Sequence, residues 1–253
     1  MKVKIGFIQS PLQKDRGKMI QDLIEEAIEK NCDIVALPEM WLTGFSFTEE
    51  DEKKAAEFLH RVRELSRKAD TLIIPGTLPE REQGRLYNTA YAIHRGGIVH
   101  KRRKLFLFEP MGESEIFSPG DPPSAFQFKS LRIAIAICYE LRFPAIFDRI
   151  IRSKADLIII PAQWPNTREE HWRTLLRGRA LETQAFVVGI NVVGKTKKLS
   201  FSGFSAVIHP LGYPIIEASH TEGLFICDIE TEEAKPYREQ VPVIRDTITH
   251  GNI

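Results

Sequence analysis

Side chains with useful chemistry stand at the ends of three apolar runs of strand length. Glu39 comes directly after one such run, Cys138 ends a second, and the pair Gln163-Trp164 follows a third. In an open α/β sheet, the groups that bind ligands gather at the carboxyl ends of the strands. A carboxyl group can move a proton and a thiolate can attack a carbonyl carbon, so these positions are candidates for acid–base and nucleophilic chemistry.

Glu39 is the candidate for proton transfer. Because it follows a strongly apolar strand directly, we expect desolvation to raise the pKa of its carboxyl group. The structural alternative is a carboxylate that pairs with a nearby arginine or caps a helix, and for Glu39 taken alone this is the commoner arrangement. A chemical role therefore depends on what surrounds Glu39 in the fold.

The chain has three cysteines, Cys32, Cys138 and Cys227. An odd and scattered set cannot form a disulfide framework, which indicates a reducing compartment. Free cysteine usually acts as a small buried hydrophobe, and we expect this of Cys32, at the end of a helix, and of Cys227, in mid-strand. Cys138 differs because polar and aromatic residues follow it into a helix, and a cysteine at such a junction can be activated by backbone amides and a nearby cation.

Lys104 closes a run of four basic residues that begins at Lys101. Such a run is usually a solvated face, but Lys104 abuts the apolar residues 105–108 and can be drawn inward. Glu113 lies in a loop and, taken alone, looks like ordinary loop acidity. Neither residue indicates a function without its neighbours in the fold.

Three other kinds of site find less support. A papain-like Cys–His pair needs a histidine in a site-like setting. The sequence excludes none of the histidines from this role, but none follows an apolar strand as Glu39 does. A structural zinc site needs close pairs such as C-x-x-C, and a phosphate-binding loop needs G-x-x-x-x-G-K-[ST]; the sequence has neither. The histidines concerned are His60 and His171 in expected helices, His94 and His100 beside an expected turn, and His250 near the end.

The elements that must position these residues alternate between short apolar strands and longer amphipathic helices. The strand-then-proline phrase at 33–38 is echoed at 156–161, and a strand and a helix precede each. Because parallel strands must be covered on both faces, two such halves predict two sheets packed face to face with helices outside, in one domain over 1–253. The expected strands are 3–9, 33–37, 71–77, 131–138, 156–161, 186–192 and 223–229, the helices are 19–28, 49–69, 144–153 and 168–184, and hairpins turn at 95–97 and 210–212.

Composition limits the partners and the compartment. The chain has 253 residues and a formal net charge of +1, which argues against duplex DNA or an anionic membrane surface as a partner. The apolar run at the N-terminus is too short for a secretory signal, and no stretch approaches the roughly 20 apolar residues that span a bilayer. We therefore expect a soluble, cytoplasmic α/β protein.

Three motifs in a fixed order resemble the signature of the nitrilase superfamily of carbon–nitrogen hydrolases. They are Pro38-Glu39, the residues RKLFLF at 103–108 and the residues CYELRFP at 138–144. Each motif alone is weak, but the three in this order are specific, and the likeness covers nearly the whole chain. It includes Trp164-Pro165, the stretch at 177–184 and Asn191.

This resemblance implies a fold and a set of catalytic residues. The implied fold is a four-layer α-β-β-α sandwich of two mixed sheets. Glu39 would be the general base, Lys104 the stabiliser of the oxyanion, and Cys138 the nucleophile that forms a thioester. Glu113 would be an auxiliary active-site glutamate; Glu115 competes for that role, and the spacing to the following Ser-Pro-Gly favours Glu113.

Neighbouring residues complete the implied site. The backbone N–H of Tyr139 would hold the oxyanion together with the lysine, and Trp164 would wall the acyl pocket, while Arg142 would brace the loop rather than bind substrate. One residue departs from the family pattern: the usual Cys-Tyr-Asp reads Cys-Tyr-Glu here, so Glu140 is one methylene longer beside the nucleophile. This departure bears on the substrate and leaves the chemistry unchanged.

Within the superfamily the sequence most resembles the ω-amidases, which hydrolyse the side amide of α-ketoglutaramate and α-ketosuccinamate. The implied partner is a small amide, with no cofactor, metal, nucleic acid or membrane. The alternatives are an N-carbamoyl amino acid amidohydrolase, a nitrilase, and a non-catalytic binding protein of the same fold. The resemblance also implies a homodimer or higher homo-oligomer, with contacts expected at 142–150, 175–184 and 236–248. The residues that carry the likeness to the ω-amidases are those at 38–41 and 163–165 and the pair His171-Trp172.

Overall fold

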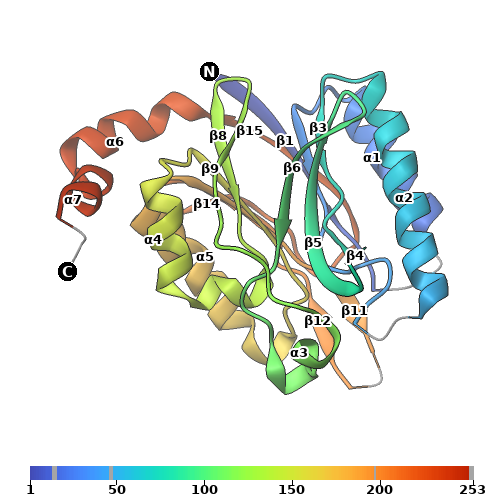
Figure 1. Ribbon diagram of the computed structural model, residues 1–253. Helices are drawn as coiled ribbons and strands as arrows, with labels where there is room; N and C mark the ends of the chain where they lie inside the picture. The colour runs from blue at the N-terminus through green and yellow to red at the C-terminus, as the bar shows by residue number, and fades with distance from the viewer. Residues whose placement is uncertain (13–15, 46–47, 197, 251–253) are drawn as a thin grey trace.

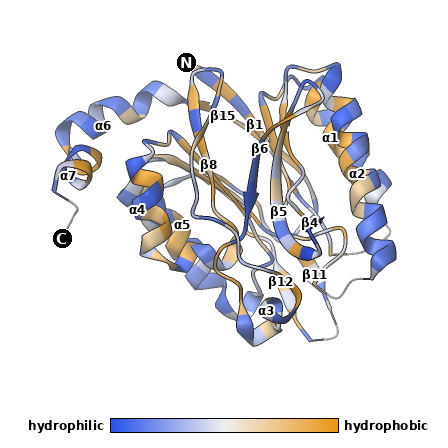
Figure 2. Cartoon of the chain, in the orientation of Figure 1, coloured by the Kyte–Doolittle hydropathy of each residue, from blue (hydrophilic) through white to orange (hydrophobic). Residues whose placement is uncertain are grey.

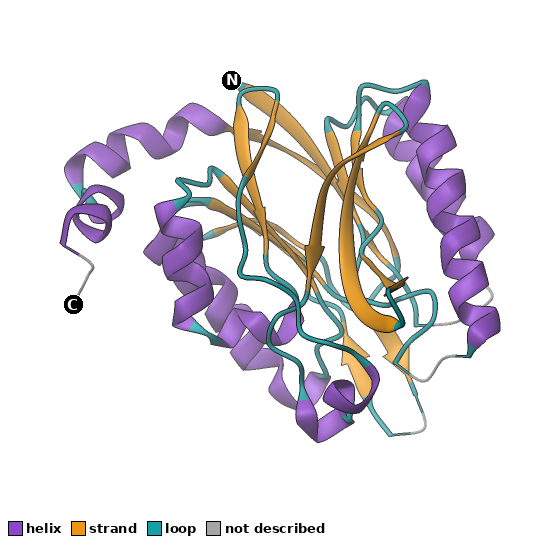
Figure 3. Cartoon of the chain, in the orientation of Figure 1, coloured by secondary structure: helices purple, strands orange, loops and turns teal. Residues whose placement is uncertain are grey.

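The computed structural model describes the chain except at residues 13–15, 46–47, 197 and 251–253. Two β-sheets face each other, and a pair of helices covers the outer face of each (Figure 1). In Figure 3 the strands lie between the two helical layers. The expected four-layer α-β-β-α sandwich is therefore confirmed.

The first sheet has seven strands and is mixed. They are β1 (Lys2–Gln9), β2 (Ile34–Ala36), β3 (Leu72–Ile74), β4 (Thr77–Glu82), β5 (Arg85–His94), β6 (Gly97–Arg103) and β15 (Gly223–Glu230). Their order is β15-β1-β2-β3-β5-β4, and β6 pairs with β5. The central strands β1, β2 and β3 run parallel, while the outer strands pair antiparallel.

The second sheet repeats this plan with six strands. They are β7 (Phe126–Phe128), β8 (Leu131–Ile135), β9 (Leu157–Pro161), β10 (Phe186–Ile190), β13 (Ala206–Ile208) and β14 (Pro214–Glu217), in the order β14-β13-β10-β9-β8-β7. Here β8, β9 and β10 run parallel, and the outer strands again pair antiparallel. A separate two-stranded ribbon joins β11 (Val193–Lys195) to β12 (Ser200–Ser202).

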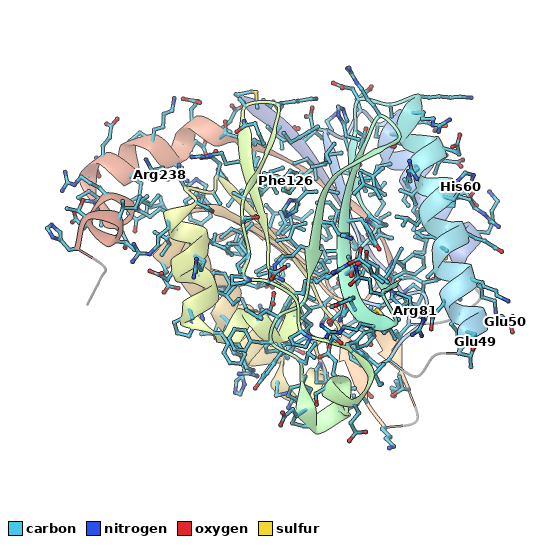
Figure 4. The ribbon with its side chains drawn as sticks, in the orientation of Figure 1. Glu49, Glu50, His60, Arg81, Phe126 and Arg238 are labelled. Atoms are coloured by element: carbon cyan, nitrogen blue, oxygen red, sulfur yellow. The ribbon has the colours of Figure 1, made fainter. Side chains whose placement is uncertain are left out.

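The helices lie outside the sheets. Thr48 caps the longest of them, because its hydroxyl oxygen accepts the N–H of Asp51 while the Asp51 carboxylate accepts the N–H of Thr48. Figure 4 shows Glu49, Glu50 and His60 on the side of this helix that faces away from the sheets. Helices α1 (Gly17–Glu29) and α2 (Glu49–Arg67) cover the first sheet, α4 (Pro144–Arg152) and α5 (Glu169–Thr183) cover the second, α3 (Glu113–Ile116) is a single turn, and α6 (Ala234–Gln240) and α7 (Val243–His250) end the described chain.

Apolar side chains from both sheets fill the space between them. Ile5 and Phe7 of β1 belong to the same buried cluster as Ile133 and Ile135 of β8. Figure 2 shows many apolar residues along the strands between the helical layers, although β6 is coloured as polar, and it shows polar residues on the outer surfaces of the helices. Each parallel strand is therefore covered on both faces, as its uninterrupted apolar sequence requires. Among the helices that the structure describes, none is long and apolar enough to cross a bilayer.

The repeated strand-then-proline phrase makes the same hydrogen bond in both halves. Asp33 precedes β2, and its carboxylate accepts the backbone N–H of Lys4 at 2.9 Å. Asp156 precedes β9 and accepts the N–H of Arg132 at 3.1 Å in the same way. Each aspartate thus connects the strand that follows it to the parallel strand beside it, β1 in the first half and β8 in the second, so the two phrases occupy equivalent positions.

The structure divides one expected strand and shortens another. The expected strand at 71–77 is split between β3 and the start of β4, because the chain turns at Gly76, which has φ +77°. A Cβ atom at Gly76 would lie 1.8 Å from the carbonyl oxygen of Pro38, so glycine is required beside Glu39. The strand expected at 131–138 ends at Ile135, and the sequence did not predict most of β4, or β7, β11, β12, α6 and α7.

Candidate active site

Cys138 stands at a sharp turn shortly after β8. A short 3₁₀ helix, Cys138–Arg142, begins there, and Cys138 has φ +46°, in the left-handed region. A residue other than glycine rarely adopts this conformation, and such residues cluster at functional sites. The Cys138 side chain is 9% exposed, and its Sγ lies 3.9 Å from the carbonyl oxygen of Gln163, beyond the end of β9.

Glu39 is fully buried beyond the end of β2. Its carboxylate accepts hydrogen bonds from Lys104 Nζ at 2.9 Å, from Asn88 Nδ2 at 2.8 Å and from the backbone N–H of Gln163 at 3.2 Å. It also lies near enough to Cys138 for its negative charge to raise the pKa of the thiol. The structure thus brings together the strand ends that carry Glu39, Cys138 and Gln163.

Lys104 is buried immediately after β6. Its Nζ donates to Glu39 at 2.9 Å and to Glu113 at 2.7 Å. In the same basic run, Lys101 and Arg103 point the other way, where both pair with Glu80. The alternation of side chains along a strand therefore separates an inward lysine from its outward neighbours.

Glu113 is the first residue of the short helix α3, and it is buried. Its carboxylate accepts hydrogen bonds from Lys104 and from the backbone N–H of Phe108, the latter at 2.7 Å. Glu115 is exposed. Of these two glutamates, the structure places Glu113 in the cluster with Glu39 and Lys104.

Asn88, on β5, belongs to the same cluster, and the sequence analysis missed it. Its Nδ2 donates to Glu39 at 2.8 Å and to Glu113 at 3.0 Å, so one amide group bridges the two carboxylates. A fully buried polar side chain in a strand needs hydrogen-bond partners. An asparagine among the apolar residues of a strand is therefore the sequence signal that could have indicated Asn88.

Glu140 makes a buried ion pair outside the pocket. Its carboxylate accepts hydrogen bonds from Arg102 at 2.7 Å, from the N–H of Leu105 at 2.7 Å and from the N–H of Ile137 at 2.8 Å. Glu140 thereby connects the turn of Cys138 to the segment that carries Lys104. Glu140 does not line the pocket, so its extra methylene belongs to this buried contact and not to the pocket lining.

Burial dominates the electrostatics of the cluster. Desolvation raises the pKa of Glu39, as expected; the charge of Lys104 opposes this rise and that of Glu113 adds to it. Desolvation also raises the pKa of Cys138, and the negative charge of Glu39 raises it further. Burial alone would lower the pKa of Lys104, but attraction to Glu39 and Glu113 outweighs it and raises that pKa. The resting site therefore holds a protonated thiol and a charged lysine, so the nearby cation does not by itself activate the cysteine.

A pocket of about 450 Å³ of empty volume, partly open to solvent, gives access to this cluster. Tyr139 and Trp164 both line it, as do Phe45 and Phe108. The Trp164 side chain is fixed by a 2.7 Å hydrogen bond from its Nε1 to the carbonyl oxygen of Arg168. The lining of the pocket thus combines four aromatic side chains with the charged cluster.

None of the described residues that line this pocket is a histidine. His171 is exposed and contacts Arg142 at 3.1 Å, and His60 lies on the outer side of α2 (Figure 4). Cys138 therefore has a carboxylate, Glu39, as its titratable neighbour, which disfavours a Cys–His pair. In the parts of the chain that the structure describes, no three His, Cys, Asp or Glu side chains are grouped to hold a metal ion.

Known proteins resemble this chain over most of its length. Residues 12–239 match the sequence model of the carbon-nitrogen hydrolase family. The chain is 32% identical to a 2-oxoglutaramate amidase of Bacillus subtilis over 228 residues, which cover 87% of both proteins. It is 31% identical to an omega-amidase of Xenopus tropicalis, over 95% of this chain and 92% of that protein.

The fold is shared with a solved structure of the nitrilase superfamily. A Saccharomyces cerevisiae protein, a member of branch 10 of that superfamily, superimposes with a TM-score of 0.83 and 25% identity, over 96% of this chain and 95% of the other. The sequence match, the sandwich fold and the buried cluster of Glu39, Lys104 and Cys138 all point to the same family. This chain belongs to the carbon–nitrogen hydrolase family of the nitrilase superfamily, and it is an enzyme that hydrolyses carbon–nitrogen bonds.

Proposed function

We propose that the enzyme hydrolyses the primary amide of a small linear acid to a carboxylate and ammonia through a thioester on Cys138. The observation that carries this proposal is the placement of Cys138 in one pocket with Glu39 and Lys104, which bond each other at 2.9 Å. Amide hydrolysis by covalent catalysis needs a nucleophile, a proton acceptor beside it and a fixed positive charge, and these three residues supply them.

Glu39 acts as the general base in the first step. As Sγ attacks the amide carbon, the thiol proton passes to the Glu39 carboxylate and negative charge develops on the carbonyl oxygen. Because the pKa values of Cys138 and Glu39 are both raised, proton transfer accompanies the attack and no standing thiolate is needed. When the carbon–nitrogen bond breaks, Glu39 returns the proton to the nitrogen, which leaves as ammonia.

Lys104 and the backbone N–H of Tyr139 stabilise the oxyanion of this step. Lys104 is held in place by two carboxylates, so it keeps its charge and its position without reorganising during the reaction. Tyr139 directly follows the nucleophile and lines the pocket. Each donor of this kind contributes about 100-fold or more to the rate.

Hydrolysis of the thioester uses the same base again. Glu39 takes a proton from water as the water oxygen attacks the thioester carbon, and it gives that proton to the sulfur as the carbon–sulfur bond breaks. Glu113 and Asn88 serve this reaction by position. They hold Glu39 and Lys104 at fixed distances and, through the charge of Glu113, help to keep the pKa of Glu39 raised.

The names of the relatives support a narrower substrate class. Proteins named 2-oxoglutaramate amidase and omega-amidase, at 32% and 31% identity, support the ω-amides of short α-keto dicarboxylic acids as substrates. The test is to assay α-ketoglutaramate, glutamine, an N-carbamoyl amino acid and a simple nitrile side by side. We expect equimolar ammonia and α-keto acid from α-ketoglutaramate, without carbon dioxide.

Each other result of this assay selects a different function. Carbon dioxide released together with ammonia from the N-carbamoyl compound would indicate a carbamoylase. Turnover of the nitrile in preference to the amides would indicate a nitrilase. No ammonia from any of the four compounds would contradict the proposal.

The pH dependence of kcat/KM is expected to report Glu39. Only the ionised carboxylate can accept the thiol proton, so activity falls as the pH falls through the pKa of Glu39. Because burial raises that pKa, the acid limb should lie above the ordinary glutamate value of about 4.3. The measurement is kcat/KM against pH, with circular dichroism at each pH to show that the protein stays folded. An acid limb at or below the ordinary value in folded protein would contradict the role of Glu39.

We further propose one domain, a reducing cytoplasmic compartment and a homodimer. An unmodified Cys138 thiol is required for the chemistry, which supports a reducing compartment.

The surface of the last helices supports a homodimer. The α7 helix packs against α4 and α5. Two large apolar side chains, Leu181 on α5 and Ile248 on α7, remain exposed, which supports association of two copies through these helices. Arg238, labelled in Figure 4, attaches α6 to the sandwich by a 2.9 Å ion pair with Asp156.

A further inference from the structure

The two groups proposed to hold the oxyanion come from different sheets. Lys104 follows β6 of the first sheet, and the backbone N–H of Tyr139 lies in the turn after β8 of the second (Figure 1). To stabilise an oxyanion, both donors must lie about 3 Å from its oxygen. The separation of the two donors therefore depends on contacts that cross from one sheet to the other.

The carboxylate of Glu140 makes such contacts on both sides of Lys104. Its Oε1 accepts hydrogen bonds from Arg102 Nη2 and from the backbone N–H of Leu105, both at 2.7 Å. Arg102 lies two residues before Lys104, and Leu105 directly follows it. One carboxylate oxygen thus holds the segment of the lysine at two points.

Glu140 also closes the turn of the nucleophile. Its Oε2 accepts the backbone N–H of Ile137 at 2.8 Å, and its own N–H donates to the carbonyl oxygen of Ile137 at 3.0 Å. Cys138, with its left-handed φ of +46°, and Tyr139 lie between these two residues. Because a residue other than glycine keeps such a conformation only where its surroundings enforce it, Glu140 helps to hold the backbone that presents both the sulfur and the N–H of Tyr139.

Arg102 depends on Glu140 for its place. Both side chains are buried, with exposed fractions of 3% and 0%. Among the residues that the structure describes, Glu140 accepts from Arg102 Nη2, whereas Nε and Nη1 are buried without a partner. Removal of either residue leaves a buried charge without its counter-charge, so each needs the other in place.

Stability alone does not account for this pair. Replacement of a buried ion pair by apolar residues of similar volume is often neutral or stabilising for a folded protein. A carboxylate, in contrast, binds its N–H donors in defined directions. Here those donors belong to the segments of Lys104 and Cys138, so the pair fixes a geometry that an apolar contact would leave free.

We propose that Arg102 and Glu140 are positioning residues for the oxyanion. They hold the N–H of Tyr139 and Nζ of Lys104 at the separation that the oxyanion requires. Neither positioning residue lines the pocket, so both act through these two donors. This inference rests on the proposed amidase function and concerns the rate of its steps. The departure from the usual Cys-Tyr-Asp then bears on the alignment of the site and not on the substrate, which differs from the expectation formed from the sequence.

The first test measures kcat and KM below the unfolding transition, with the amide that the wild-type enzyme hydrolyses best. Because the pair acts on groups that contact the transition state, kcat in Arg102→Met should fall about tenfold to 100-fold, while KM changes less than about twofold. Arg102→Lys keeps the charge and should recover part of kcat. Glu140→Asp also keeps its charge but is one methylene too short for all three donors, so we expect kcat to fall about tenfold with Tm within a few degrees of wild type.

Arg173→Met is the matched control. Arg173 pairs with Glu217 at 2.7 Å between α5 and β14, and neither residue lines the pocket. Loss of this pair should lower Tm and leave kcat and KM unchanged. A fall in kcat as large in Arg173→Met as in Arg102→Met would overturn the positioning role. If Arg102→Met does not fold, Glu140→Asp decides, and a wild-type kcat in that variant would contradict the proposal.

A second measurement does not depend on turnover. Propanal with an isotopic label at its aldehyde carbon adds to Cys138: the sulfur bonds that carbon, and the thiol proton passes to the oxygen, which then lies where the oxyanion would lie. Carbon NMR gives the dissociation constant of this thiohemiacetal, which we expect to rise about tenfold in Arg102→Met and to stay unchanged in Arg173→Met.

The two measurements separate this inference from the function on which it rests. Unchanged kcat together with unchanged propanal affinity in Arg102→Met would overturn the positioning role while leaving amide hydrolysis in place. If the wild-type enzyme releases ammonia from no amide, the proposed function fails, and the propanal titration alone decides for or against the positioning role.

Discussion

Replacing Cys138 with alanine is expected to abolish ammonia release, by about 10⁴-fold or more, without unfolding the protein. The sulfur is the nucleophile in the pocket that holds Glu39 and Lys104. Because burial keeps the thiol protonated, its removal deletes no charge, and alanine meets the same φ of +46° with no larger side chain than cysteine. The measurements are ammonia release and thermal unfolding, with Tm lowered by no more than a few degrees.

Cys32→Ala is the matched control for this variant. Cys32 is buried outside the pocket, where desolvation raises the pKa of its thiol to about 11. Its removal should leave ammonia release near normal and cost about 1 kcal/mol of stability through the small cavity it leaves. Ammonia release at the wild-type rate in Cys138→Ala would overturn the thioester mechanism. An equal loss in both variants would show that the thiols act through folding rather than chemistry.

The positions of Glu39 and Cys138 at strand ends could be predicted because the signals are local. Each follows or ends an apolar run short enough for a strand, and the carboxyl ends of neighbouring parallel strands meet at one edge of a sheet. The repeated strand-then-proline phrase also predicted two equivalent halves, which the matching hydrogen bonds of Asp33 and Asp156 explain. The apolar runs and the repeated phrase were therefore sufficient to predict the two sheets and the strand ends that carry the site.

The partners of the site residues could not be predicted in the same way. Asn88 lies 49 residues from Glu39 and 25 from Glu113 along the chain, and only the folded sheets bring these side chains within hydrogen-bond distance. A strand pattern shows that Asn88 is surrounded by buried residues, but it does not show which groups Asn88 faces. The turn at Cys138 was likewise hidden, because no glycine marks its left-handed backbone.

The basic run at 101–104 is explained by the alternation of side chains along a strand and not by its charge alone. Taken as a block of charge, it predicts a solvated face with Lys104 as an exception. Taken as part of a strand with a period of two, it places Arg102 and Lys104 on the same side, and the structure buries both. The partner of Arg102 is Glu140, so the departure from the usual Cys-Tyr-Asp belongs to this buried pair.

Replacing Lys104 with methionine is expected to remove activity and much of the stability. Glu39 and Glu113 would be left as buried carboxylates without their shared cation, and breaking a buried ion pair in this way costs about 3–5 kcal/mol. Loss of the oxyanion donor should lower kcat by about 100-fold or more in the protein that remains folded. The measurements are urea unfolding and ammonia release below the unfolding transition.

Lys101→Met provides the matched control for the lysine. Lys101 pairs with Glu80 on the outward side of the same strand, and a surface pair contributes about 0–1 kcal/mol. We expect near-normal stability and ammonia release in this variant. Equal destabilisation by the two substitutions would contradict a special role for Lys104.

The pH dependence of the Lys104→Met defect separates lost charge from lost packing. Without the lysine, its charge no longer opposes the desolvation that raises the pKa of Glu39, so this pKa lies further above its value in the unfolded chain. The folded variant then binds more protons than the unfolded one, so its stability falls as the pH rises. The deficit relative to wild type should therefore grow between about pH 5 and about pH 8, whereas a packing defect would be the same at both. Lys104→Arg keeps the charge and should recover part of the stability, but its bulkier planar cation does not fit a site built for a point charge, so ammonia release should stay low.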